Sequence, residues 1–373
     1  MRVIAGRRLA AAHNVKRPCL AAERHGRRAG VAALVAVSAV VLLGSCGGGN
    51  SGTPCETTSV RAPTGGVADA GRPITAYVVN FTRDTVTPIN LATNSPGTAI
   101  AVGHGPVAIA ITPNGATAYV VNRYDNTVTP INLATHSPGT AIAIGYQASS
   151  IAISPNGSTG YVVNNGSNTV TPINLAANRP GPEIGVGNGP TAIAITPDGT
   201  KAYVTNSVGD SVTPIDLATN CAKSPIQETI GAQPCGIAIT PDGKTAYVTN
   251  IGNATITPIN LATNVPGIAI QEPTGAAPCA IAITPNGTTA YVVNNGGNTV
   301  AAINLATNVP VASIHLAMAG TEGTENPIAI SPDGSAAYVG ITDLNIVRAI
   351  NLATKKVGIA ISVAYPAAIA ITH

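Results

Sequence analysis

Charged and aromatic residues are scarce in this sequence. Of its 373 residues, 9 % are charged and 3 % are aromatic, with one Phe and no Trp. Beyond residue 45 there is also no long stretch in which apolar residues recur at the 3.6-residue period of an amphipathic helix. These absences exclude a protein built mainly from helices.

Familiar catalytic and metal-binding motifs are missing as well. The sequence has no Gly-x-Ser-x-Gly, His-Glu-x-x-His, Cys-x-x-Cys or phosphate-loop motif. No pair among its six His residues has the local spacing of metal ligands. The motif search therefore predicts no catalytic residue, no metal and no cofactor, but it does not test ligands drawn from distant repeats.

Basic residues concentrate at the N-terminus. Residues 1–45 hold eight Lys or Arg and one acidic residue, which leaves eleven basic and fifteen acidic residues in the rest of the chain. The net charge of +3 thus divides into +7 for the first segment and −4 for the remainder. A mildly acidic body gives no support to nucleic-acid binding.

The basic segment has the pattern of an export signal. Three arginines between positions 24 and 28 precede an apolar run from Val31 to Leu43. As a helix this run would span about 20 Å, too short for a hydrocarbon core of about 30 Å. It ends in Leu43-Gly44-Ser45-Cys46, which resembles the bacterial lipoprotein signal, whose cysteine is lipidated.

We therefore expect residues 1–45 to be a lipoprotein signal peptide and Cys46 to carry a lipid. Residues 46–72, which begin with a Gly-rich stretch, would be a flexible tether. The protein would then be exported and anchored to the cell membrane on its extracytoplasmic side. The alternative is an ordinary signal peptide that is cut nearby.

The rest of the chain is a repeat of about forty-two residues. Forty Gly and twenty-nine Pro punctuate short β-branched runs, which is typical of an all-β protein. A Tyr-Val-Val-Asn or related segment recurs at Tyr77, Tyr119, Tyr161, Tyr203, Tyr247, Tyr291 and Tyr338. An Ile-Ala-Ile segment starts at Ile109, Ile151, Ile193, Ile237, Ile281, Ile328 and Ile369. Both elements occur seven times.

Each repeat offers four short strands, so residues 73–373 are expected to form a seven-bladed β-propeller of four-stranded antiparallel blades. The first repeat begins at its second strand, Thr75 to Asn80, and the chain ends in an Ile-Ala-Ile strand without a partner. These two halves complete one blade, so the C-terminal inner strand should close the ring in the first blade. An open solenoid is the alternative.

Proline recurs inside the third strand of each of the first five repeats, where it removes a ladder donor. We expect either a bulge there or a fourth strand too short to reach the proline.

The repeat resembles the family named after its Tyr-Val-Thr-Asn signature, which is intact at Tyr203–Asn206 and Tyr247–Asn250. This resemblance covers nearly all of residues 73–373 and implies a relation to surface-layer and envelope proteins, with a fold shared by lactonase-like propellers. Metal-dependent lactonases place carboxylates and Asn where the inner strands begin. The matching residues here are mostly Val107, Ser149, Thr191, Cys235, Cys279 and Ala367, which argues against such an enzyme.

Two cysteines occupy equivalent positions in neighbouring repeats. Cys235 and Cys279 each follow a proline just before an inner strand, so their Cα atoms should approach the limit of about 7 Å for a disulfide. We predict this disulfide, with two buried free thiols as the alternative. Cys55 and Cys221 are the other cysteines of the exported part.

Departures from the repeat gather in loops of blades one to three. The loops that join strands two to three and four to one emerge on the same face, and they carry the residues that we take as a candidate binding patch: Phe81, Arg83, His104, Arg123, Tyr124, Asp125, Tyr146, Gln147 and Tyr365. Aromatic and Arg side chains favour recognition surfaces. Greater divergence of the terminal blades would also explain them.

The sequence thus favours a non-enzymatic, monomeric envelope propeller that binds a protein, glycan or small ligand through this loop face. The alternatives are a lactonase-like hydrolase with a site at the channel mouth and a structural surface or adhesion protein.

Overall fold

The computed structural model describes residues 73–229, 232–273, 275–316 and 326–372. The predicted signal peptide (1–45), Cys46, Cys55 and the tether (46–72) lie outside these ranges. All of the described residues belong to one compact unit, Gly66–His373. Within the described part of that unit, no helix has the length and apolar character needed to cross a membrane.

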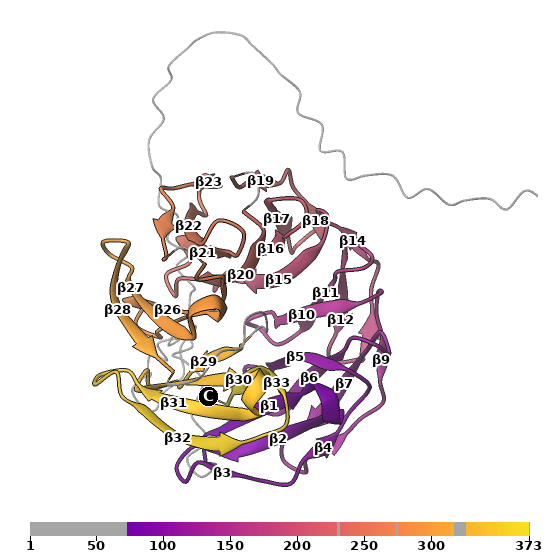
Figure 1. Ribbon diagram of the computed structural model, residues 1–373. Coiled ribbons are helices and arrows are strands. Elements are labelled where there is room, and N and C mark those ends of the chain that lie inside the picture. Colours follow the sequence, from indigo (N-terminus) through magenta and orange to yellow (C-terminus); the bar gives the residue numbers. More distant parts are fainter. Residues whose placement is uncertain (1–72, 230–231, 274, 317–325, 373) are drawn as a thin grey trace, which may run out of the picture. The chain divides into compact units, whose positions relative to one another are not determined.

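Seven antiparallel sheets make up the unit, and each is one blade (Figure 1). From blade 1 to blade 7, the inner strands are β33 (Pro366–Ile371), β5 (Pro106–Ile111), β10 (Ala148–Ile153), β15 (Pro190–Ile195), β20 (Pro234–Ile239), β25 (Pro278–Ile283) and β29 (Ile328–Ile330). The second strands are β1 (Thr75–Asn80), β6 (Thr117–Asn122), β11 (Thr159–Asn164), β16 (Lys201–Asn206), β21 (Thr245–Asn250), β26 (Thr289–Asn294) and β30 (Ala336–Ile341). The third strands are β2 (Thr85–Asn90), β7 (Thr127–Asn132), β12 (Thr169–Asn174), β17 (Ser211–Asp216), β22 (Thr255–Asn260), β27 (Thr299–Asn304) and β31 (Ile346–Asn351).

The fourth strand is split in two wherever the third strand contains proline. In blades 1 to 5 it consists of the pairs β3 (Ser95–Pro96) and β4 (Ile100–Ala101), β8 (Ser137–Pro138) and β9 (Ile142–Ala143), β13 (Arg179–Pro180) and β14 (Ile184–Gly185), β18 (Cys221–Ala222) and β19 (Ile226–Gln227), and β23 (Val265–Pro266) and β24 (Ile270–Gln271). In blades 6 and 7 the matching residues are Ala302 and Ala349, and the fourth strands β28 (Val309–His315) and β32 (Val357–Ser362) are continuous. The fourth strand is thus interrupted at the proline and resumes beyond it with one extra residue, as in the predicted bulge: residues 97–99 lie opposite residues 87–88. The Gly97 N–H still donates to the carbonyl oxygen of Pro88 at 2.7 Å, and only the return bond is missing, because proline has no N–H.

The C-terminal strand closes the ring, as the sequence predicts. Strand β33 pairs antiparallel with β1, with Val78 opposite Ile369, and Figure 1 shows the yellow β33 beside the indigo β1. Strand β33 also contacts the inner strands β29 and β5 of the two neighbouring blades. No exposed inner edge is left between the first blade and the last.

Helical structure in the described ranges is limited to three 3-10 turns. They are η1 (Phe81–Arg83), η2 (Asn295–Gly297) and η3 (Thr342–Leu344), and each joins a second strand to a third. All three therefore lie in loops on the same face of the ring.

The hydrophobic core lies between neighbouring blades, and the same packing recurs at each blade interface around the ring. Tyr77 and Val79 of blade 1, for example, pack with Val120 and Ile131 of blade 2. Because the apolar faces of each four-stranded sheet are covered only by its two neighbours, burial of these side chains stabilises the whole ring rather than any single blade.

The signature Tyr and Asn have different structural roles. The Tyr side chain reaches the next blade, as where Tyr203 Oη donates to Asn264 Oδ1 at 2.9 Å. In blades 1 to 5 the Asn side chain stays in its own blade, as where Asn122 Nδ2 donates to Thr127 Oγ1 at 3.0 Å and to Thr129 Oγ1 at 2.8 Å. The signature thus joins each blade to the next and braces its central hairpin.

Candidate functional site

A cavity of about 670 Å³ opens where the inner strands of all seven blades converge. Ala and Ile from the Ile-Ala-Ile segments form much of its wall. Its polar and aromatic lining comes from the loops and strand starts: Phe81, Arg123, Ser149, Asn165, Thr191, Asn326, Thr342 and Tyr365. Among the described residues that line the cavity, Arg123 alone carries a full charge. The cavity is therefore suited to a ligand that carries a negative group.

Arg123 begins the loop between β6 and β7. Its backbone N–H donates to the carbonyl oxygen of Gly105 at 2.9 Å, which fixes where the side chain leaves the loop. The residue is half-buried, and no ion pair between described residues involves its guanidinium. A planar guanidinium in this setting can form two parallel hydrogen bonds with a carboxylate or phosphate.

Three aromatic rings of the predicted patch contact one another beside Arg123. The Phe81 ring centroid lies 5.6 Å from that of Tyr124 and 5.7 Å from that of Tyr365. Phe81 and Tyr365 line the cavity, whereas the Tyr124 side chain is 67 % exposed. We call Phe81, Tyr124 and Tyr365 the aromatic rim.

His104 and Asp125 form a second group of the predicted patch. The His104 Nδ1 atom lies 3.0 Å from Asp125 Oδ1, and Asp125 Oδ2 accepts the backbone N–H of His104 at 2.8 Å. Hydrogen bonding to Asp125, together with the charges of Asp125 and Asp84, raises the pKa of His104. The same hydrogen bonds lower the pKa of Asp125. At neutral pH the exposed pair thus holds an ionised carboxylate in a fixed position against His104.

The remaining patch residues do not join these groups. The Gln147 side-chain amide donates to Tyr146 Oη at 3.2 Å, and Tyr146 is 58 % exposed. Arg83 lines a separate surface pocket with Asn345 and Ser362. The sequence-predicted patch therefore contains one cluster that reaches the cavity and two outlying parts.

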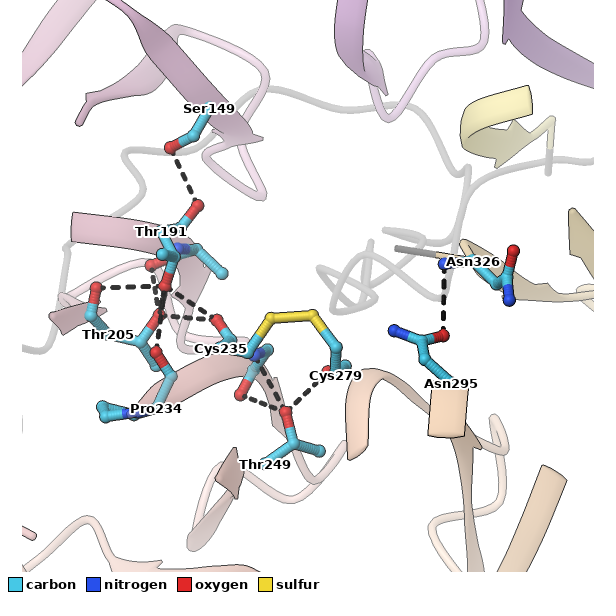
Figure 2. The surroundings of a disulfide bond; sticks show 11 residues. Ser149, Thr191, Thr205, Pro234, Cys235, Thr249, Cys279, Asn295 and Asn326 are labelled. Atoms are coloured by element: carbon cyan, nitrogen blue, oxygen red, sulfur yellow. Dashed lines mark hydrogen bonds between the residues drawn. A yellow bond between two sulfur atoms is a disulfide. The ribbon is translucent and has the colours of Figure 1, made fainter. Parts of the chain in front are cut away.

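Sequence reasoning missed the amides of the cavity, Asn165 and Asn326. Asn165 follows the signature Asn and donates from Nδ2 to the carbonyl oxygen of Pro190 in the next blade at 2.9 Å. Asn326 donates its backbone N–H to Asn295 Oδ1 at 3.4 Å (Figure 2). A second Asn directly after the signature marks Asn165 and, as Asn295, the residue that binds Asn326, but no such signal marks Asn326 itself.

Hydroxyl groups join the inner strands of blades 3 to 6 (Figure 2). Ser149 Oγ donates to the carbonyl oxygen of Thr191 at 2.9 Å, and Thr191 Oγ1 donates to that of Cys235 at 3.0 Å. Thr249 Oγ1 donates to the carbonyl oxygen of Cys279 at 2.6 Å. Ser149 and Thr191, which the sequence marked as unlike lactonase metal ligands, thus hold neighbouring blades together, as does Thr249 of the second strand β21.

A disulfide joins Cys235 of blade 5 to Cys279 of blade 6, the pair that the sequence singled out (Figure 2). Their Cα atoms are 5.2 Å apart, and both residues line the cavity. In the part of the chain that the structure describes, no three His, Cys, Asp or Glu residues are grouped to hold a metal ion.

Solved structures of this architecture have diverse functions. The chain resembles a hydrazine synthase of Kuenenia stuttgartiensis at 23 % identity, with 75 % of this chain and 92 % of that chain covered and a TM-score of 0.68. It resembles the periplasmic gluconolactonase of Pseudomonas aeruginosa at 17 % identity, 80 % and 99 % coverage and a TM-score of 0.67. It also resembles the virginiamycin B lyase of Staphylococcus aureus at 15 % identity, 76 % and 87 % coverage and a TM-score of 0.60. Likeness at these identities shows the fold alone.

A search of curated proteins gave no significant match. The family model described as "Lactonase, 7-bladed beta-propeller" matches residues 77–265, which is just over half of the chain and spans blades 1 to 5. Together with the seven closed blades, this match means that the chain belongs to the lactonase family of seven-bladed β-propellers.

Proposed function

We propose that the axial cavity binds a small ligand of the lactone or sugar-acid class, with Arg123 as the contact for its negative group. The observation that carries this proposal is the single charged side chain, a half-buried guanidinium, among the described residues of an otherwise neutral cavity. Charge-assisted hydrogen bonds from Arg are among the strongest that a neutral cavity can offer an anion. Amides and hydroxyls around it would orient the rest of the ligand.

The family match supports this ligand class. The family description is lactonase, and one solved neighbour is named a gluconolactonase. The geometry supports binding best, because the described lining contains no carboxylate or imidazole in position to act as a general base. Lactone hydrolysis at the same cavity is the second candidate, and the family match favours it.

Calorimetric titration of the full-length protein with D-gluconate and D-glucose tests the proposal. We expect gluconate to bind and Arg123→Gln to weaken it by about tenfold or more, since a hydrogen bond to a charged group contributes about 1.5–3 kcal/mol. Arg179→Gln, which removes an exposed charge on β13, is the matched control and should bind gluconate as the unaltered protein does. Equal gluconate affinity in Arg123→Gln and in the unaltered protein would contradict the proposal.

Ring opening of D-glucono-δ-lactone distinguishes the two candidates. The proton released on opening can be followed at constant pH with and without protein. A protein-dependent rate that Arg123→Gln reduces would assign hydrolysis to this cavity, whereas gluconate binding without such a rate would leave a binding protein.

We further propose that the protein acts at the cell envelope, held by a lipid on Cys46 after removal of residues 1–45. The Leu-Gly-Ser-Cys sequence at positions 43–46 supports this. Mass spectrometry of the mature N-terminus should find a diacylated Cys46. An unmodified N-terminus at another residue would show that an ordinary signal peptidase cuts the chain.

A further inference from the structure

The aromatic residues outside the signature are concentrated at one place. The chain has ten Tyr and one Phe, and seven Tyr belong to the buried signature. Of the four aromatic residues left, Phe81, Tyr124 and Tyr365 form the aromatic rim, although Phe81 and Tyr365 lie at opposite ends of the sequence. In a chain with 3 % aromatic residues this clustering calls for a cause other than core packing.

The rim is continuous with the cavity. Phe81 and Tyr365 line the cavity, Phe81 contacts Tyr124, and Tyr124 is two-thirds exposed on the outer side. The three rings therefore form a track that leads from the space around Arg123 to the surface of the loop face. Each ring offers an apolar surface on which a flat apolar ligand face can stack.

Backbone contacts hold the rim in place. The Phe81 N–H donates to the carbonyl oxygen of Tyr365 at 3.1 Å, and the Tyr365 N–H donates to Asn345 Oδ1 at 2.7 Å. Tyr365 has a φ of 46°, in the left-handed region where a bulky side chain is uncommon. The matching residues of blades 2 to 6 also have positive φ: Gly105, Gln147, Gly189, Gln233 and Ala277. The turn is therefore common to the repeat, and blade 1 differs in placing an aromatic side chain on it.

Tyr124 lies over a glycine that leaves room for its ring. A Cβ atom on Gly105 would come within 2.5 Å of Tyr124 Cδ2, so only glycine permits this ring position. The Tyr124 N–H donates to the carbonyl oxygen of His104 at 3.2 Å, and the carboxylate of the next residue, Asp125, lies 3.0 Å from His104 Nδ1. Rings with carboxylate acceptors beside them suit a pyranose, because its C–H face stacks on the ring and its hydroxyls donate to the carboxylate.

We propose that the ligand extends beyond the cavity as an oligosaccharide, whose acidic terminal unit reaches Arg123 and whose neutral pyranose units stack along the aromatic rim. This inference rests on the proposed function for its acidic end and adds the class of the remainder. Neutral units are assigned to the rim because its rings offer apolar surface, and because the nearby carboxylates of Asp84 and Asp125 lie against the His104 ring, at 4.0 Å and 3.0 Å.

Paired titrations of the full-length protein test the inference. The probes are gluconate, maltotrionate (gluconate extended by two α-linked glucose units) and its β-linked counterpart cellotrionate. We expect at least one trisaccharide to bind about tenfold or more tightly than gluconate, since two further rings are stacked. Tyr124→Ala should lower the affinity for that trisaccharide to the affinity for gluconate, and it should leave gluconate binding unchanged.

The control variants separate the two proposals. Tyr146→Ala, which removes an exposed ring outside the rim, should change neither affinity. Arg123→Gln should weaken the binding of gluconate and of the trisaccharide alike. If gluconate binding needs Arg123 but both trisaccharides bind no more tightly than gluconate, the oligosaccharide inference is wrong and the proposed function stands. If Arg123→Gln leaves gluconate binding unchanged, the proposed function itself fails.

Discussion

Two glutamates occupy a position that is apolar in the other five blades. Glu228 and Glu272 directly follow the outer strands β19 and β24, where the matching residues are Val102, Ile144, Val186, Leu316 and Val363. All seven donate their backbone N–H to the turn between the second and third strands, as Glu272 does to the carbonyl oxygen of Ala254 at 2.9 Å. Burial raises the pKa of both carboxyl groups.

Glu272 substitutes for a missing hydroxyl. In blade 5 the signature Asn250 donates from Nδ2 to Thr257 Oγ1 at 2.9 Å, but blade 6 has Ala301 at the position of that threonine. The buried Asn294 of blade 6 instead donates to Glu272 Oε2 at 2.8 Å. The carboxylate of one blade thus satisfies the amide of the next.

This substitution predicts a compensating pair. Glu272→Val should lower the free energy of unfolding by about 1–3 kcal/mol, because it leaves the buried Asn294 amide without its acceptor. Glu272→Val combined with Ala301→Thr should recover most of the loss, since it restores the pattern of blades 1 to 5. Urea unfolding of the two single variants and the double variant measures the coupling, and additive effects would show that Glu272 does not replace the hydroxyl.

The same glutamates predict how stability depends on pH. A carboxyl group whose pKa is higher in the folded than in the unfolded state binds more protons when folded, so stability falls as pH rises above the unfolded value of about 4.3. Glu228→Gln and Glu272→Gln should flatten this fall, because neither variant must ionise in a buried site. Unfolding midpoints between about pH 4 and pH 8 test it, and a decline of equal slope in the unaltered protein and the double Gln variant would refute the assignment.

At the scale of single elements, the inner strands of blades 5 and 6 are joined by a hydroxyl and a disulfide. Thr249 Oγ1 donates to the carbonyl oxygen of Cys279 and accepts the N–H of Gly236 at 2.9 Å. A Cβ atom on Gly236 would come within 2.1 Å of the Cys279 carbonyl oxygen, so the two strands approach as closely as glycine allows. Ser149 links blade 3 to blade 4, and Thr191 links blade 4 to blade 5. At the same positions blades 1 and 2, which carry the aromatic rim and Arg123, have Ala367 and Val107, which offer no hydroxyl.

Thr249→Val tests what the hydroxyl contributes. Valine is nearly isosteric and is the residue of blades 1, 2, 3 and 6 at this position, but it leaves the Gly236 N–H without its acceptor. We expect a loss of about 1–3 kcal/mol in the free energy of unfolding, with a smaller loss for Thr249→Ser, which keeps the hydroxyl. Equal stability of the valine and serine variants would show that packing rather than hydrogen bonding matters here.

At the scale of the whole molecule, the repeat made the ring predictable and left much of the site obscure. Each blade contacts only its neighbours, so local spacing and the two half-blades at the chain ends sufficed to predict seven blades and their closure. Phe81, Tyr124 and Tyr365 stood out because they break the pattern. Asn165 and Asn326 did not, because Asn is common throughout the repeat and only the closed ring shows which of them face the cavity.

Ring closure itself can be tested by removing β33. A chain that ends at Ala364 would expose the inner edge of β1 and lose the burial of Ile369 and Ile371, each of which contributes about 1.5–3 kcal/mol. We expect this truncated protein to unfold at lower urea concentration and to associate through the open edge, as measured by size-exclusion chromatography.

The matched control is a circular permutant that carries residues 365–372 ahead of Thr75 through a Pro-Asn-Gly turn, the turn that follows the inner strand of blade 2. The permutant should remain monomeric and unfold cooperatively, because blade 1 keeps all its strands and only the order of the chain changes. A truncated protein as stable and monomeric as the permutant would mean that the ring does not depend on this strand for closure.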